Sequence, residues 1–358
     1  MARTPVKTTV RWWLVAPAIG LAALLVPLPE AYVEQFYSRD LYPWLQRGLT
    51  ALSNLVGFSI LDVLVGIGAL ALLYRLTRLG KVAFATGPID ALWEGLRRTL
   101  RFAGVVLILF VLVWGLNYKR VPLRSTVPAA PDETSEALQA VILESNALAT
   151  RLRAQVEPEL TFEAARDQLV APMGAALAAL GREPLLPPGR PKSSVLLTPY
   201  FTLAGINGML NPFALESIVH PGLLPIERPF VLAHEWAHLA GHGSEAEANA
   251  VGWLACLKGG PSAAYSASIY LIMEAAGRLP EQTRSRVLAR LDPGVRADIG
   301  AISRRMLQHN PQVQRVASRV YDEYLQANGV EDGVADYGLA LRLILSPPLR
   351  QALTNYGK

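Results

Sequence analysis

Cysteine is nearly absent from this sequence. Cys256 is the only cysteine among 358 residues. A single cysteine excludes an intramolecular disulfide framework and also excludes the cysteine-rich zinc sites. Any metal ion that this chain binds must therefore use histidine and carboxylate ligands.

A strong charge of either sign is also lacking. The formal net charge is +5, and the lysines and arginines lie beside apolar runs. Nucleic-acid-binding proteins instead carry a basic stripe or patch, often with interleaved aromatic residues. We therefore expect no nucleic-acid partner.

Hydrophobic residues are abundant, at 51% of the chain, which is more than most water-soluble domains carry. Three apolar segments account for the excess, at residues 12–28, 55–74 and 102–118. Each is near the roughly 20 residues that a bilayer-spanning helix requires. The first could instead be a cleaved signal peptide, but VPLPEA is a poor cleavage site and further spans follow. We predict a membrane anchor of three transmembrane helices in residues 1–120, with the lipid bilayer as partner.

The distribution of cations predicts the orientation of this anchor, because positively charged loops stay in the cytoplasm. Three cations precede the first span, namely Arg3, Lys7 and Arg11. Six lie between the second and third spans: Arg75, Arg78, Lys81, Arg97, Arg98 and Arg101. Residues 121–358 are therefore expected outside the cytoplasm, although three cations oppose this orientation, namely Lys119, Arg120 and Arg124.

The composition after residue 120 is that of a water-soluble domain, which begins with a proline-containing linker. Residues 134–156 and 161–180 have apolar residues at helical spacing, and a Ser or Thr can cap each segment. Residues 193–206 and 211–220 are typical of short strands around a Gly-Met-Leu-Asn turn. Beyond Gly260 the pattern is mostly helical. The sequence predicts a mostly helical α+β domain over residues 121–358.

The segment PFVLAHEWAHLAG carries the clearest chemical signal. Pro229 suits the start of a helix and Gly241 its end, so His234 and His238 share one face, where two imidazoles can bind one zinc ion. Glu235 is turned by about 100° and can accept a proton from a water whose pKa zinc brings to about 7. A chance His-Glu-x-x-His occurs in roughly one such chain in several hundred, so we favour a zinc site over two histidines with ordinary hydrogen bonds.

A catalytic zinc site needs a third protein ligand and one open position for water. His242 is a poor candidate, because Gly241 and Gly243 disfavour the helical continuation that would present it to the metal. The stronger candidates are Glu245 and Glu247.

A new helix should begin at Ser244, since Ser-Glu-Ala-Glu is a capping box that occupies Glu247 at the helix start. Glu245 is then the freer carboxylate, and Asn249 can orient an imidazole. We predict zinc ligands His234, His238 and Glu245, with Glu247 as the alternative to Glu245.

A HExxH helix followed by a carboxylate-bearing helix resembles the zincins, especially the gluzincins, whose second helix supplies a Glu in an ExxxD pattern. The resemblance implies that His234, His238 and Glu245 are zinc ligands and that Glu235 is the catalytic base. Asn249 departs from the pattern, since it stands at the place of the Asp, and the gap between His238 and Glu245 is shorter than is usual in gluzincins.

Four motifs resemble more closely an uncharacterised family of bacterial three-span membrane proteins grouped with zincin-like metallopeptidases. They lie between about residues 100 and 345: WGLNYKRVPL, GMLNPFALE, HEWAHLAGHGSEAEANAVGWLAC and VYDEYLQANGVEDGVADYG. The resemblance implies a multi-pass protein of the bacterial cytoplasmic membrane. By analogy with zincins, NPFALES is either an edge strand that pairs with an extended peptide or an ordinary sheet strand.

The sequence thus predicts a membrane-anchored zinc metallohydrolase, a peptidase acting on an unidentified peptide or protein. Two alternatives remain at this stage: a non-catalytic scaffold or sensor that zinc stabilises, and an amidase acting on cell-wall peptides. The substrate and the oligomeric state stay open. So does the residue that stabilises the oxyanion, for which the candidates are Tyr200, His220, His242, Tyr265 and Tyr270.

Overall fold

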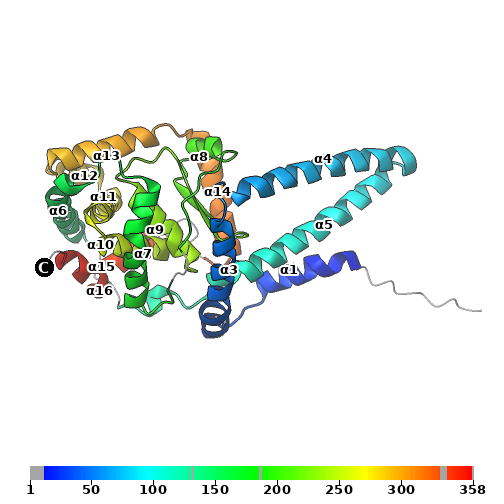
Figure 1. Ribbon diagram of the computed structural model, residues 1–358, viewed down its shortest axis with the longest axis horizontal. Helices are drawn as coiled ribbons and strands as arrows, with labels where there is room; N and C mark the ends of the chain where they lie inside the picture. The colour runs from blue at the N-terminus through cyan, green and yellow to red at the C-terminus, as the bar shows by residue number, and fades with distance from the viewer. Residues whose placement is uncertain (1–11, 129, 131–132, 185–187, 331–336, 357–358) are drawn as a thin grey trace, which may run out of the picture.

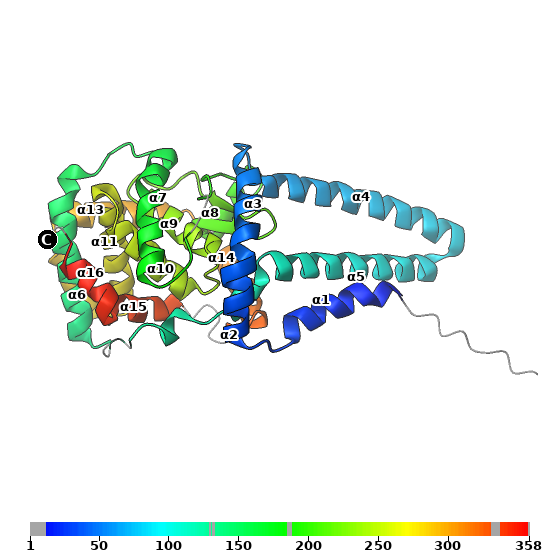
Figure 2. The ribbon, with the colours of Figure 1, turned by 60° about the horizontal axis from the view of Figure 1, so that its bottom comes forward.

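The computed structural model describes residues 12–128, 130, 133–184, 188–330 and 337–356. A helical body is joined to a long hairpin of α4 (Ile60–Thr86) and α5 (Pro88–Val113), and α1 (Val15–Leu25) lies beside α5 (Figure 1). The view turned by 60° shows the same two parts, the helical body and the hairpin (Figure 2). The predicted mostly helical fold with a small β component is confirmed.

The body contains α2 (Glu30–Tyr32), a π-helical segment (Val33–Leu41) and α3 (Tyr42–Asn54) before the hairpin. The helices after the hairpin are α6 (Ser135–Leu152), α7 (Phe162–Ala179), α8 (Thr198–Ala204), α9 (Arg228–Leu239), α10 (Glu245–Leu257), α11 (Pro261–Gly277), α12 (Glu281–Ala289), α13 (Pro293–Met306), α14 (Pro311–Ala327), α15 (Tyr337–Leu345) and α16 (Pro347–Thr354).

Helix α10 is the centre of the body. Every one of its residues is buried, and it packs against α9, α7, α11 and α15. Its sequence explains this position, because a helix that is apolar nearly all round is stable only inside a core. The acidic residues of its first turn, Glu245 and Glu247, are therefore buried as well.

The sequence predicted several helix boundaries correctly. Thr134 and Thr161 cap α6 and α7 through their side chains, as expected for residues 134–156 and 161–180. Helix α9 ends just before Gly241, whose φ of 87° is the left-handed conformation that glycine adopts readily. Ser244 caps α10 by accepting a hydrogen bond from the amide of Glu247.

The strand predicted at residues 193–206 was wrong, whereas the one predicted at 211–220 was right in part, because residues 216–219 form a strand. Residues 198–204 form α8, and the expected Gly-Met-Leu-Asn turn is the strand β1 (Gly208–Asn211), which pairs antiparallel with β2 (Glu216–Val219). The turn lies instead at residues 212–215, where the Asn211 side chain accepts a hydrogen bond from the Phe213 amide. Since β2 also bridges to Lys192, the edge strand of this sheet is β1, and NPFALES is mostly turn.

Helix α4 is the one helix in the described part of the chain that is long and apolar enough by itself to cross a membrane. It begins at Ile60, later than the predicted span at 55–74, and continues through three of the six cations. Two further pairs of segments are long and apolar enough only when each pair is counted as one span. They are α1 with residues 30–54, bent by 105°, and α5 with residues 115–125, bent by 60°.

Helices α1 and α5 approach closely at two glycines. A Cβ added to Gly104 would lie 2.4 Å from the backbone nitrogen of Pro17, and a Cβ added to Gly20 would lie 3.0 Å from the Gly104 carbonyl oxygen. Small residues at such a crossing are typical of helices that pack in membranes. The contact keeps α1 against the hairpin.

Residues 30–54 pack with the body, although they precede the predicted domain boundary at residue 120. The Tyr42 hydroxyl donates to the Leu239 carbonyl of α9 at 2.8 Å, and the Thr50 hydroxyl donates to the Leu215 carbonyl at 2.9 Å. The start of the chain therefore helps to position the helix that carries the HExxH motif.

The start of α4 is fixed to the body through two carboxylates. Glu216 of β2 accepts hydrogen bonds from the amides of Ile60 and Leu61 at 3.0 and 2.8 Å and forms a buried ion pair with Lys192 at 2.9 Å. Asp62, which lies inside the predicted second span, accepts a hydrogen bond from the Val195 amide at 2.7 Å. Each carboxylate thus joins the first turn of α4 to the body.

Candidate metal centre

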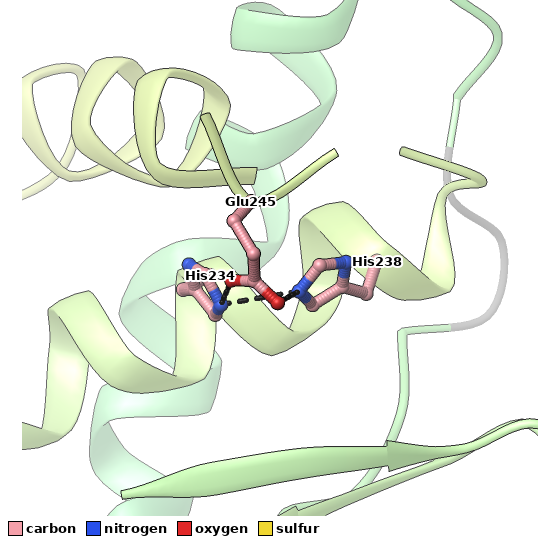
Figure 3. A group of neighbouring side chains, drawn as sticks. All are labelled: His234, His238 and Glu245. Atoms are coloured by element: carbon pink, nitrogen blue, oxygen red, sulfur yellow. Dashed lines mark hydrogen bonds and ion pairs between the residues drawn. The ribbon is translucent and has the colours of Figure 1, made fainter. Parts of the chain in front are cut away.

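The structure brings the three predicted ligands together (Figure 3). The Nε2 atoms of His234 and His238 are 3.1 Å apart, and they lie 3.3 and 3.5 Å from the two carboxylate oxygens of Glu245. Ligand atoms about 2.0–2.1 Å from a tetrahedral zinc ion are separated by roughly 3.3 Å, so these three side chains fit that ion. The Glu245 Oε2 atom is buried, and no described residue donates a hydrogen bond to it.

The other ring nitrogen of each histidine is held by α10 or by the turn before it. His234 Nδ1 lies 2.8 Å from Asn249 Oδ1, and His238 Nδ1 lies 2.7 Å from the His242 carbonyl oxygen. An Nδ1–H donor on each ring leaves both Nε2 atoms with lone pairs for a metal. Asn249 thus occupies the orienting position that its place in the sequence suggested.

Residues from the end of the hairpin and from α3 cover the carbonyl groups at the end of α9. The Trp114 indole donates to the His238 carbonyl at 3.2 Å, and Arg120 donates to the Gly241 carbonyl at 3.1 Å. Tyr42 donates to the Leu239 carbonyl. The last carbonyls of a helix have no partner within it, so these donors stabilise the turn between the two histidines and Glu245.

Glu247 and His242 contact each other and lie outside the group of candidate ligands. Glu247 accepts a hydrogen bond from the Leu123 amide at 2.6 Å, and its second oxygen lies 2.8 Å from His242 Nδ1. Of the two carboxylates that the sequence left open, Glu245 is the one near the histidines. Burial lowers the pKa of His242 to about 4, against the opposing effect of Glu247.

Glu235 packs against the first residue of β1. A Cβ added to Gly208 would lie 2.4 Å from Glu235 Oε1, so only glycine leaves room for the carboxylate. The other oxygen, Oε2, is buried, and no described residue donates to it. Burial raises the pKa of Glu235 to about 7, against the attraction of His234 and His238. A carboxylate with this pKa can both accept and release a proton near neutral pH.

Comparison with protein families shows a match over most of the chain. Residues 37–345 match the family described as protein of unknown function (DUF3810). The chain belongs to this family. The match begins well before residue 100, where the motif resemblance begins, and includes α3 and the whole hairpin. No curated protein and no solved structure matches the chain. Membership in DUF3810 therefore confirms a domain of unknown function.

In this DUF3810 chain, Tyr321 of α14 lies in the motif VYDEYLQANGVEDGVADYG, but the sequence alone assigned it no role. Its hydroxyl donates a hydrogen bond to Glu245 Oε1, so a helix near the end of the chain contacts the candidate third ligand. Helix α14 carries no metal-binding motif, and only the tertiary fold reveals the contact. We infer that Tyr321 positions Glu245.

The residues predicted as candidates for oxyanion stabilisation have different surroundings in the structure. Tyr200 is exposed on α8, and the Tyr265 hydroxyl donates to Asp298. His220 Nε2 lies 2.9 Å from the Thr202 hydroxyl, and Tyr270 stacks on Phe230 with ring centroids 3.8 Å apart. None of these residues belongs to the group of candidate ligands.

For the zinc hydrolase proposed below, we predict that Gly208→Ala disables Glu235 as the base without removing the metal. The new methyl group requires the Glu235 carboxylate to move, whereas His234, His238 and Glu245 lose no contact. We expect the zinc content measured by elemental analysis to remain that of the wild type, and hydrolysis to fall by about 10²-fold or more. Gly174→Ala on α7 is the matched control, since a Cβ there meets nothing within 4 Å. Wild-type hydrolysis by Gly208→Ala would refute the proposed position of the base.

A buried ionic cluster lies beside this centre. Glu34 accepts from Arg120 Nε at 2.9 Å and from Arg182 at 2.7 Å. Burial alone would raise the pKa of Glu34, but hydrogen bonds and positive charge from these arginines lower it to about 2. The cluster joins residues 30–54 to the segment that covers α9.

We predict that Glu34→Gln makes the stability of the protein less dependent on acid pH. The pKa of Glu34 is lower in the folded state than in the unfolded chain, so its contribution to stability is present above about pH 4.5 and is lost as the pH falls toward about 2. Thermal unfolding in detergent should show a lower melting temperature for the variant at about pH 7 and a smaller difference at about pH 3. Glu281→Gln, at an exposed pair on α12, is the control. An equal loss at both pH values would contradict the charge-based account.

Proposed function

We propose that this protein is a membrane-anchored zinc-dependent hydrolase that cleaves peptide bonds with a zincin-like site. One observation carries the proposal: the Nε2 atoms of His234 and His238 lie 3.1 Å apart, and each lies within 3.5 Å of a carboxylate oxygen of Glu245, beside the buried carboxylate of Glu235. A site that only stabilised the fold would not need a carboxylate next to it with one oxygen unpaired. This favours an enzyme over the scaffold or sensor.

The residues of the site have separate roles in the proposed reaction. A zinc ion held by His234, His238 and Glu245 would supply a Lewis acid that polarises the substrate carbonyl and acidifies a water molecule. Glu235 accepts the proton from the attacking water and releases it to the leaving amine, as a general base and then a general acid. Asn249 and the His242 carbonyl keep the imidazole rings oriented.

The sheet suggests where an extended substrate could bind. Strand β1 is the edge strand, and its first residue, Gly208, contacts the base. An extended peptide that pairs with β1 would pass beside Glu235. In our proposal β1 takes the role that the sequence suggested for NPFALES.

The reaction can be tested with the purified full-length chain in detergent. We expect it to cleave members of a mixed peptide library, to lose this activity with a zinc chelator and to recover it on addition of zinc. Cleavage of purified cell-wall fragments but not of the library would favour the amidase. Activity on neither substrate, with no zinc bound, would refute the proposed hydrolase.

We also propose that α1, α4 and α5 are three spans and that the body lies outside the cytoplasm. Helix α4 leaves the body at Ile60 and reaches its cations only at Arg75, Arg78 and Lys81, so the basic end of the hairpin is far from the body, as the positive-inside rule favours (Figure 1). Reporter fusions after Arg124 test this orientation. Activity only from a reporter that functions in the cytoplasm would reverse it.

A further inference from the structure

An exposed apolar surface begins where α4 leaves the body. We call it the apolar rim, and its residues are Val195, Leu196, Tyr200, Leu203, Val316 and Val320. The side chains of Val195, Val316 and Val320 are 82%, 63% and 61% exposed. Single exposed apolar residues are ordinary, but a group of them marks a surface that a membrane or another molecule covers.

Hydrogen bonds place one end of the rim at the start of the spanning helix. The Val195 amide donates to Asp62, in the first turn of α4. Helix α8 follows directly and carries Tyr200 and Leu203. The Leu203 carbonyl then accepts a hydrogen bond at 2.8 Å from the amide of Asn310, the residue that caps α14. The segments that carry the rim are therefore joined to one another, from the first turn of α4 through α8 to the start of α14.

Helix α14 has the pattern of a helix that lies flat on a membrane. Val316 and Val320 are one turn apart and form an exposed apolar stripe, while Arg315 and Arg319 form an exposed basic stripe next to it. Arginines in that position can reach lipid phosphates while the valines enter the acyl region. Both views of the ribbon place α8 and α14 on the side of the body from which α4 leaves (Figures 1 and 2).

From these observations we infer that the apolar rim rests in the lipid–water interface of the bilayer that α4 enters. A helix that crosses a membrane fixes the level of the bilayer surface near its first turn, and the rim is bonded to that turn. Lipid is therefore the occupant that the position of the rim favours, rather than a second protein chain. Since Tyr321 follows Val320 and contacts Glu245, the inference also places the candidate metal centre close to the membrane surface.

Site-directed spin labelling of the full-length chain tests this inference without relying on any enzymatic activity. Cys256 is fully buried, so a cysteine introduced at an exposed position is the one that reacts. The variants are Leu196→Cys, Val316→Cys and Val320→Cys, each labelled and reconstituted into vesicles of zwitterionic and anionic phospholipid. Ser285→Cys, exposed on α12, is the matched control, and unlabelled wild type establishes the background.

We expect the three rim labels to collide with dissolved oxygen more than with a water-soluble nickel chelate, with a ratio several-fold above that of the Ser285 label. Two results would overturn the inference. Rim labels as accessible to the nickel chelate as the control would show that the rim faces water. Rim labels shielded from both reagents, in detergent as well as in vesicles, would show that protein covers the rim.

Discussion

Replacing Glu235 by Gln should abolish hydrolysis while leaving the zinc in place. Glutamine has nearly the same shape, so the packing against Gly208 is kept, but an amide cannot accept the proton of the attacking water. Because Glu235 is not among the three candidate ligands, elemental analysis should still find one zinc ion per chain. We expect the turnover rate on a cleavable peptide to fall by about 10²–10⁴-fold.

The matched control for Glu235→Gln is Glu281→Gln, which changes an exposed carboxylate on α12 and should leave both zinc content and rate unchanged. Loss of zinc from Glu235→Gln would show that Glu235 binds the metal. An unchanged rate with zinc retained would mean that another group acts as the base.

Glu245→Ala should have the largest effect on metal binding. It removes the only carboxylate in the candidate ligand set of the described residues and leaves two histidines, so we expect zinc affinity to fall by more than about 100-fold. The loss of the ion should also lower the melting temperature, because bound metal stabilises the folded state. Isothermal titration with zinc after chelation, together with thermal unfolding, measures both effects.

Glu247→Gln is the control for Glu245→Ala, since it alters a carboxylate two residues away that contacts Leu123 and His242 and not the histidine ligands. Zinc affinity should stay within a few-fold of the wild type. The harsher change Glu247→Ala should cost about 1–3 kcal/mol of stability, because the buried amide of Leu123 would lose its acceptor. If Glu247→Gln released zinc and Glu245→Ala did not, the ligand assignment would be wrong.

Local sequence patterns were sufficient to place the helices that carry the site. The spacing of apolar residues, the capping residues Thr134, Thr161 and Ser244, and the glycine at position 241 depend on neighbours within one or two helical turns. The predicted ligands His234, His238 and Glu245 lie on two such helices joined by a short turn, so their proximity follows from local structure.

Contacts between distant segments could not be predicted in the same way. Tyr321 reaches Glu245 from 76 residues away, and Gly208 contacts Glu235 only because β1 packs against α9. The strand predicted at residues 193–206 was misplaced because short apolar runs fit a helix as well as a strand. The sequence analysis assigned residues 30–54 to the membrane anchor because of their composition. In the structure, hydrogen bonds from Tyr42 and Thr50 attach this segment to the body.

X-ray absorption spectroscopy at the zinc edge of the purified full-length protein tests the central claim most directly. Our account predicts stoichiometric zinc with a first shell of nitrogen and oxygen at about 2.0–2.1 Å, the outer-shell scattering of two imidazole rings, and no sulfur. Glu245→Ala should lose this spectrum, and Glu247→Gln should keep it. Absence of stoichiometric zinc from the wild type, or a shell without histidine, would contradict the assignment of His234, His238 and Glu245 as a zinc site.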